Sequence, residues 1–138
     1  MLAIDPGSKK SGFAFADRLR IAVHPLEPVR TNGDDAALLA HIAALVEERD
    51  VSTLLVGVPL DPEGGETRRS GEVRVLVARL RERFPHLDVR TYDEHLTTKE
   101  AESRLREAGY SGPEIQARKD SWAAMVLLED WLESGEPE

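Results

Sequence analysis

The opening of the chain places a carboxylate where chemistry can take place. Met-Leu-Ala-Ile is an apolar run that ends in the single carboxylate Asp5, and the turn residues Pro6 and Gly7 follow at once. This pattern predicts a buried strand that holds the Asp5 side chain at the edge of a sheet. The predicted strand over residues 88–94 also closes on carboxylates, and such groups bind divalent cations. An isolated Asp-Pro-Gly sequence is also a common turn, so residues further along must decide.

The elements that position these carboxylates begin with three strands. A second strand over residues 12–16 alternates large and small side chains. A third short strand over residues 20–24 is expected to end before Pro25 and Pro28, which cannot donate to a sheet ladder. Short turns separate these strands, so we expect an antiparallel meander.

The rest of the chain alternates helices with strands. Apolar residues between Leu38 and Val46 repeat at helical spacing, with Asn32 or Asp34 as the cap. The continuous apolar run over residues 53–58 is typical of a parallel strand that is buried on both faces. A loop over residues 61–66 precedes a helix whose apolar face runs from Val73 to Phe84 and which ends at Pro85. The strand over 88–94 follows, and then a helix from a Thr97/Glu100 capping box to Gly109. After a connection through Gly112 and Pro113, the last helix carries on its core face Trp122, Met125, Val126 and Leu132.

Composition is typical of one globular domain of 138 residues, which we place at residues 1–133 with a short acidic tail at 134–138. The chain has no cysteine and no apolar run of membrane-spanning length, and it begins directly with a strand. These features predict a soluble cytoplasmic protein with no signal peptide and no membrane partner. The net charge is −8, but without its last ten residues the chain carries 18 basic and 21 acidic residues, so a nucleic-acid partner is not excluded.

The order of elements is that of an α/β protein with the RNase H-like fold, in which a five-stranded mixed sheet, three antiparallel strands and then two parallel ones, is flanked by helices. Four sequence blocks make the resemblance specific. Ile4-Asp5-Pro6-Gly7-Ser8-Lys9, Val56-Gly57-Val58-Pro59-Leu60, Asp93-Glu94-His95-Leu96-Thr97-Thr98 and Asp120-Ser121-Trp122-Ala123-Ala124 resemble the signature blocks of the YqgF family, in the family's order and across nearly the whole chain. That family is described as Holliday-junction resolvases and as pre-16S rRNA processing nucleases.

The resemblance implies that Asp5, Glu94 and Asp120 form an acidic triad that binds two divalent metals, Mg²⁺ or Mn²⁺. Hydrolysis of a phosphodiester needs an activated water, a neutralised phosphorane and a stabilised leaving oxygen, and two metals can supply all three. Successive strand residues point to opposite faces, so Asp93 and Glu94 cannot both face one metal; the family match selects Glu94. Taken alone, Asp120 is also explained as an acidic residue near the start of the last helix, where it interacts with the macrodipole.

Two positions depart from the family pattern. Asp61 stands where Asn is usual, and either a spare metal ligand or a turn residue would explain it; we favour the turn. His95 stands where Arg is usual, so a titratable group replaces a fixed charge. The basic residues that flank the proposed site in sequence are our candidates for phosphate contacts: Lys9, Lys10, Arg68, Arg69, Arg118 and Lys119.

The leading hypothesis is a metal-dependent endonuclease that processes the 5′ end of pre-16S rRNA, with ribosomal components as partners. The alternative substrate is a Holliday junction, for which a two-fold homodimer would be expected rather than a monomer. A second class is a phosphate-binding ATPase, because Asp5-x-Gly7-Ser8 followed by Gly12 also resembles the first phosphate motif of the actin-like and sugar-kinase proteins. A third class is a non-catalytic ribosome assembly factor, but three mutually repelling carboxylates favour metal binding.

Overall fold

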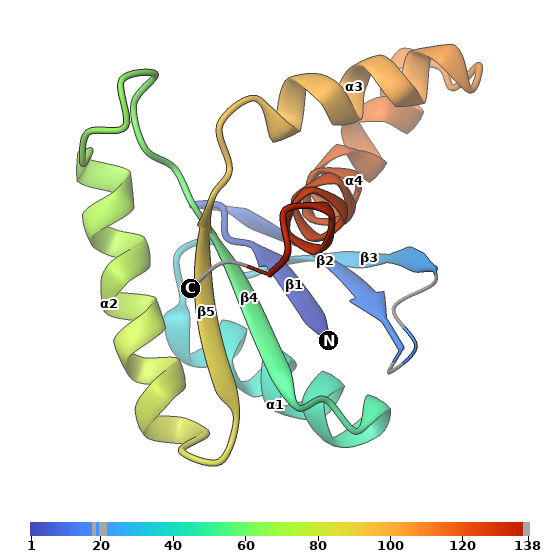
Figure 1. Cartoon of the computed structure of the whole chain (residues 1–138). Coiled ribbons are helices and arrows are strands. Elements are labelled where there is room, and N and C mark those ends of the chain that lie inside the picture. The colour runs from blue at the N-terminus through green and yellow to red at the C-terminus, as the bar shows by residue number, and fades with distance from the viewer. Residues whose placement is uncertain (18, 20–21, 137–138) are drawn as a thin grey trace.

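The computed structural model of this protein describes residues 1–17, 19 and 22–136, and consists of five strands and four helices within that part of the chain (Figure 1). The elements are, in order, β1 (Leu2–Asp5), β2 (Lys10–Ala16), β3 (Val23–Arg30), α1 (Asp35–Arg49), β4 (Thr53–Val58), α2 (Arg68–Arg83), β5 (Asp88–Asp93), α3 (Thr97–Glu107) and α4 (Gly112–Glu133). The acidic tail predicted for residues 134–138 is described only as far as Glu136.

All five strands form one sheet in the order β3-β2-β1-β4-β5. β1 pairs antiparallel with β2 and β2 pairs antiparallel with β3, whereas β1 and β4, and β4 and β5, are parallel. The predicted α/β fold with its mixed sheet is therefore confirmed. Since β1 lies at the centre of the sheet, its last residue, Asp5, is flanked by strands on both sides.

The predicted end of the third strand was wrong. We expected the strand to stop before Pro25 and Pro28, but β3 continues through both prolines to Arg30. β3 is an edge strand, where a missing N–H costs no ladder hydrogen bond if it faces outward. The start of the predicted strand, residues 20 and 21, lies outside the described residues.

Helices cover both faces of the sheet (Figure 1). α1 and α2 pack on one face, and α4 crosses the other, with α3 packed mainly against α4 rather than against the sheet. The core on the α1 and α2 face is built from side chains such as Leu2, Ile4 and Leu80, and the core on the α4 face from Ala3 and Trp131. Alternation along β1 therefore directs Leu2 and Ile4 to one face and Ala3 to the other, as a period of two requires.

The helix ends follow recognisable caps. Asp34, one of the two predicted caps of α1, accepts a hydrogen bond from the backbone N–H of Ala37 at 3.1 Å. α4 begins earlier than expected, because Ser111 and Glu114 form a reciprocal capping box and the predicted connection becomes the first helical turn. On the predicted core face of α4, Val126 is buried, and Trp122, Met125 and Leu132 are partly buried and pack against the core. No helix in the described part of the chain is long and apolar enough to cross a membrane.

Candidate active site

The site begins with Asp5, the last residue of β1, whose side chain points to the α4 face of the sheet. Alternation along the strand requires this, since Ala3 already lies in the core on that face. In the antiparallel pairing of β1 with β2, Asp5 lies directly opposite Gly12. The central strand thus holds the Asp5 carboxyl at one end of the sheet, as the sequence predicted.

Glu94 follows β5 directly and extends the pairing of β4 with β5 by one hydrogen bond, because its backbone N–H donates to the carbonyl of Val58 at 3.2 Å. Tyr92 packs on the α4 face, so Glu94, two residues later, points to the same face as Asp5. Asp93 is exposed, and its Oδ1 accepts a hydrogen bond from the backbone N–H of His95 at 3.0 Å. The structure thus separates the two neighbouring carboxylates as alternation predicts.

Gly57 in β4 leaves the space into which Glu94 fits. A Cβ atom at Gly57 would lie 2.6 Å from Oε2 of Glu94 and 3.0 Å from Cδ2 of Leu127 on α4. Real atoms do not approach this closely, so any side chain at position 57 would displace Glu94. The block that contains Gly57 was part of the resemblance to the family. The sequence did not indicate that Gly57 makes room for the Glu94 side chain.

Asp120 is brought to the site by an unusually close contact between α4 and β2. A Cβ atom at Gly12 would overlap the backbone carbonyl of Asp120. The pairing of β2 with β3 shifts register between Ser11 and Phe13, and the freed backbone N–H of Phe13 donates to Oγ of Ser121 at 3.0 Å. Gly12 therefore faces Asp5 along the sheet and Asp120 above it.

The position of Asp120 within its helix differs from the expectation. Asp120 was expected near the start of the last helix, but α4 begins at Gly112, so Asp120 lies more than two turns inside it. The macrodipole acts within the first turn, and the explanation of Asp120 as an N-terminal helix carboxylate is therefore wrong.

The electrostatics of the site are those of crowded carboxylates. Burial of the carboxyl group is the largest cause that raises the pKa of Asp5 well above its ordinary value of 3.8. A hydrogen bond to Glu94 and the negative charges of Glu94 and Asp120 raise this pKa further, while the positive charge of Arg69 opposes them. Oε2 of Glu94 is buried and accepts no hydrogen bond from the described residues, whereas the buried Oδ2 of Asp120 has the ammonium group of Lys10 beside it, at 3.2 Å. One buried oxygen of the site thus lacks the donor that such an atom normally has.

This donor set fits a divalent cation. Within residues 1–17, 19 and 22–136, no three acidic or histidine side chains are grouped as a ready set of ligands for one ion. Asp5 and Glu94 are in contact, whereas Oδ2 of Asp120 lies 3.2 Å from Nζ of Lys10. The chemistry of the site is still that of a hard cation, because every free donor is a carboxylate oxygen and a cation would neutralise the charge that raises the pKa of Asp5.

Two of the six predicted phosphate-binding residues lie at the carboxylates. Lys10 pairs with Asp120, and its amine also donates to the carbonyl of Gln116 at 3.0 Å. Arg69, at the start of α2, is close enough to lower the pKa of Asp5. Arg69 also lines a cavity of about 310 Å³ that includes Gly7 and Ser8 of the turn after Asp5. The backbone of this turn and the positively charged Arg69 side chain form a suitable place for a phosphate.

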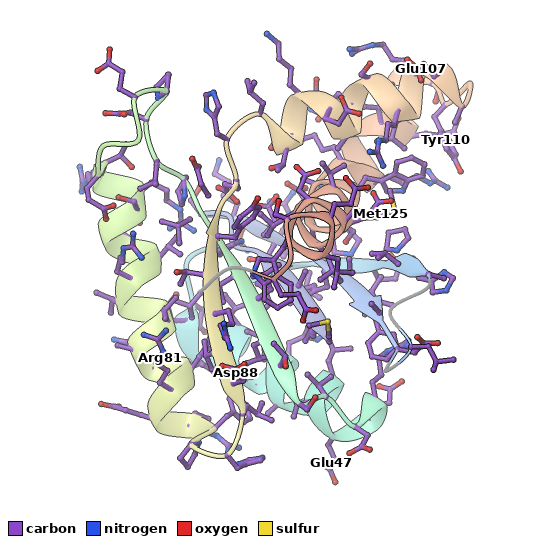
Figure 2. The ribbon with its side chains drawn as sticks, viewed as in Figure 1. Glu47, Arg81, Asp88, Glu107, Tyr110 and Met125 are labelled. Atoms are coloured by element: carbon purple, nitrogen blue, oxygen red, sulfur yellow. The ribbon has the colours of Figure 1, made fainter. Side chains whose placement is uncertain are left out.

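The other four basic candidates lie elsewhere. The side chain of Arg68 is 98% exposed, and Lys9 is exposed on the turn between β1 and β2. Arg118 stacks over the ring of Tyr110, 4.5 Å from its centroid. Tyr110 lies at the outer end of the arm formed by α3 and the start of α4, beyond the sheet (Figure 2). Lys119 is partly buried on α4, next to Asp120 in sequence.

Asp61 and Thr97 have structural roles. Oδ1 of Asp61 accepts hydrogen bonds from the backbone N–H groups of Glu63 and Gly65 at 2.9 and 2.7 Å, which is the turn that we favoured. The predicted Thr97/Glu100 capping box was wrong, because the cap of α3 is Leu96 and no side chain caps this helix. The hydroxyl of Thr97 instead donates to the carbonyl of Glu94 at 2.8 Å and so fixes the turn that carries Glu94.

Comparison with known proteins identifies the family. Residues 1–134 match the family model described as "RuvX: Holliday junction resolvase". The chain belongs to this family. It is the YqgF family that the four sequence blocks indicated.

Relatives in this family cover almost the whole chain. One from Anaeromyxobacter sp. is 40% identical over 132 residues, 96% of this chain and 95% of the relative, and one from Chlorobaculum tepidum is 31% identical over 136 residues, 97% and 93%. Both are named "Putative pre-16S rRNA nuclease".

Solved structures show the same fold at low sequence identity. The RuvC protein of T. thermophilus, in complex with a Holliday junction substrate, has a TM-score of 0.60 at 16% identity, with 99% of this chain and 97% of that chain covered. The Fowlpox virus resolvase, in complex with its substrate Holliday junction DNA, has a TM-score of 0.59 at 11% identity, with 99% and 100% covered. These likenesses establish the resolvase-type RNase H-like fold predicted from the order of elements.

Proposed function

We propose that this protein is a metal-dependent endonuclease that hydrolyses phosphodiester bonds in the 5′ region of pre-16S rRNA, in the cytoplasm and together with ribosomal components. The observation that carries the proposal is the crowding of Asp5 by Glu94 and the negative charge of Asp120, together with a buried oxygen of Glu94 that has no donor among the described residues. A protein keeps such a costly arrangement when a cation relieves it. The names of the relatives support rRNA as the substrate.

The three carboxylates would hold Mg²⁺ or Mn²⁺. When bound, two such ions supply an activated water and a stabilised leaving oxygen for in-line displacement at phosphorus. The residues of the chain do the rest. Asp5 is fixed by the central strand, Glu94 by the turn that Thr97 holds, and Asp120 by the contact of α4 with Gly12, so the carboxylates need little rearrangement.

The basic side chains near the carboxylates would orient the phosphate. Arg69 lines the cavity that includes Gly7 and Ser8 of the turn after Asp5, and Lys10 lies at Asp120. A negatively charged backbone attracts both side chains, and their contacts give affinity without reading the base sequence. Such binding should weaken steeply as salt is added.

Cleavage of a labelled RNA that spans the 5′ end of pre-16S rRNA tests the proposal, with Mg²⁺, Mn²⁺ or a chelator. Asp5→Asn and Glu94→Gln are nearly isosteric and should lower the rate by about a hundredfold or more while the protein stays folded, because each removes a metal-binding charge. Asp93→Asn is the matched control. Its side chain adjoins Glu94 in sequence but is exposed, and an amide can still accept the His95 hydrogen bond. Unchanged cleavage by Asp5→Asn would overturn the assignment of the site.

The second candidate function is resolution of four-way DNA junctions, which the family description and the two junction-bound structural neighbours favour. A resolvase cuts two strands symmetrically and should therefore be a two-fold dimer. A labelled junction, included in the same assay, separates the two candidates. Paired symmetric nicks by a dimeric protein would support the resolvase, and RNA cleavage with an intact junction would support rRNA processing. If neither is cut, the non-catalytic assembly factor becomes the best interpretation.

A further inference from the structure

Leu96 combines two unfavourable features beside the site. Its side chain is 59% exposed, although it is a large apolar residue. Its backbone has φ 65°, in the left-handed region that disfavours residues with a branched carbon chain. The other non-glycine residues with positive φ in the described part of the chain are Asn32, Asp50 and Glu136. Asn and Asp tolerate this conformation far better than Leu does.

The turn around Glu94 explains the backbone of Leu96. The carbonyl of Glu94 accepts hydrogen bonds from the backbone N–H of Thr97 at 3.0 Å and from its hydroxyl at 2.8 Å. The carbonyl of Leu96 then accepts the N–H of Glu100 at 3.0 Å and begins α3. In this turn the Glu94 side chain contacts Asp5 and the backbone at position 96 is left-handed. The turn does not require leucine, because Gly or Asn would adopt the same conformation at lower cost.

Within the described residues, the Leu96 side chain takes no part in the apolar core. It belongs to none of the three apolar clusters of the core, although Ala101 and Thr97 of the same helix are buried. The turn that carries it lies at the same end of the sheet as the loop between β4 and α2 (Figure 1). The side chain is thus presented to solvent two residues from a proposed metal ligand. Unfavourable backbone conformations of this kind cluster at active sites and at positions that hold ligands.

We propose that Leu96 contacts a nucleobase of the substrate, unstacked from its neighbour, next to the phosphodiester that is cut. This inference rests on the proposed nuclease function. Apolar side chains can enter between neighbouring bases and separate them, and every base offers an apolar face. The neighbours of Leu96 favour a nucleic acid over a protein partner, because His95, Thr98 and Lys99 are exposed and polar, and one leucine is far smaller than a protein interface.

Binding of RNA that carries single 2-aminopurine bases tests the proposal. The Asp5→Asn variant serves as the background, so that the oligonucleotide stays intact. With Leu96 present, the fluorescence at one labelled position should rise on binding as that base leaves its stack. Leu96→Asn should reduce this rise by about threefold or more. In the catalytically competent protein, which keeps Asp5, the same substitution should slow cleavage by about tenfold. Leu96→Met, which keeps an apolar side chain, should retain both.

A matched control separates this role from a general surface effect. Leu19→Asn changes another exposed leucine, 74% exposed, on the turn after β2 at the end of the sheet opposite to Asp5. It should leave fluorescence and cleavage unchanged. Leu96→Asn should also keep or raise the melting temperature, by about 2–5 °C, because Asn suits the left-handed backbone.

The outcomes distinguish the two proposals. If wild-type protein cuts the RNA and Asp5→Asn does not, but Leu96→Asn matches the wild type in fluorescence and rate, then the role of Leu96 is refuted and the nuclease function stands. A fall in melting temperature together with lost activity would assign Leu96 a structural role and likewise refute the contact. If the wild type neither binds nor cuts any nucleic acid, both proposals fail.

Discussion

Strands β1 and β2 present side chains of very different size to the two faces of the sheet. On the face that α1 and α2 cover, large side chains of these strands such as Ile4 and Phe13 fill the space. On the face that α4 covers, Ala3 and Ala14 lie beneath the helix, and Gly12 touches its backbone. Both faces supply apolar burial, and the second also allows α4 to come close enough for the negative charge of Asp120 to raise the pKa of Asp5. We conclude that residue size on the α4 face serves the site as much as the fold.

Leu80→Ala should produce the largest loss of stability and show what the α1 and α2 face contributes. Leu80 is fully buried on α2, so removal of its side chain leaves a cavity and should cost about 2–5 kcal/mol of the free energy of unfolding. Because no part of the active site rests on this side chain, cleavage per folded molecule should be roughly unchanged. Urea unfolding gives the first quantity and initial rates give the second. A fall in rate beyond the folded fraction would show that the two faces are coupled.

Gly12→Ala should have the opposite profile, with a smaller loss of stability and a complete loss of cleavage. The added methyl group would overlap the Asp120 carbonyl, so α4 must move away from β2 at a cost of about 1–3 kcal/mol. Gly71→Ala in α2 is the matched control. There an added Cβ meets no atom within 4 Å, and the helix should gain about 0.5–1 kcal/mol. If Gly12→Ala still cuts its substrate, the close approach of α4 is not what positions Asp120.

The sequence was sufficient for the parts of the site that depend on local pattern. The apolar run that ends at Asp5 and the alternation that separates Asp93 from Glu94 are properties of single strands, and the structure agrees with both. The order of the elements also predicted three antiparallel and two parallel strands, and the strand pairings confirm this. These features need no knowledge of what packs against the strand.

The parts that could not be predicted depend on contacts between elements. Nothing in the sequence around Gly12 or Ser121 shows that a register shift in β2 frees an N–H for a helix more than a hundred residues later. The sequence suggested that Thr97 caps α3, but its hydroxyl bonds to the Glu94 carbonyl. β3 runs through Pro25 because it lies at the edge of the sheet, and that position is known only once all five strands are placed.

Asp5→Asn should stabilise the protein near neutral pH in the absence of divalent metal. The raised pKa of Asp5 means that, between 3.8 and the folded-state value, the folded state binds more protons than the unfolded state. Stability therefore falls as pH rises through this window, and the penalty persists above it. An amide carries no such penalty and can donate to the unpartnered Oε2 of Glu94. Unfolding curves of both proteins in chelator should coincide near pH 4 and diverge toward pH 7, and a variant that is less stable at pH 7 would contradict this.

Lys10→Met should have the smallest effect, a change in metal affinity. It tests whether Lys10 and a metal ion compete for Asp120. Nζ of Lys10 lies 3.2 Å from Oδ2 of Asp120, so a cation at the carboxylates competes with this amine for the same oxygen. Both side chains are partly exposed, and the pair should be worth little, so we expect Mn²⁺ to bind about threefold more tightly to the variant in calorimetry. RNA binding should weaken at the same time, because a phosphate contact is lost. Lys99→Met, on the exposed side of α3, should change neither the metal affinity nor its dependence on Asp120. Weaker Mn²⁺ binding by Lys10→Met would mean that the lysine holds Asp120 in place for the metal. The position of Asp120 would then depend on this charge pair as well as on the small residues beneath α4.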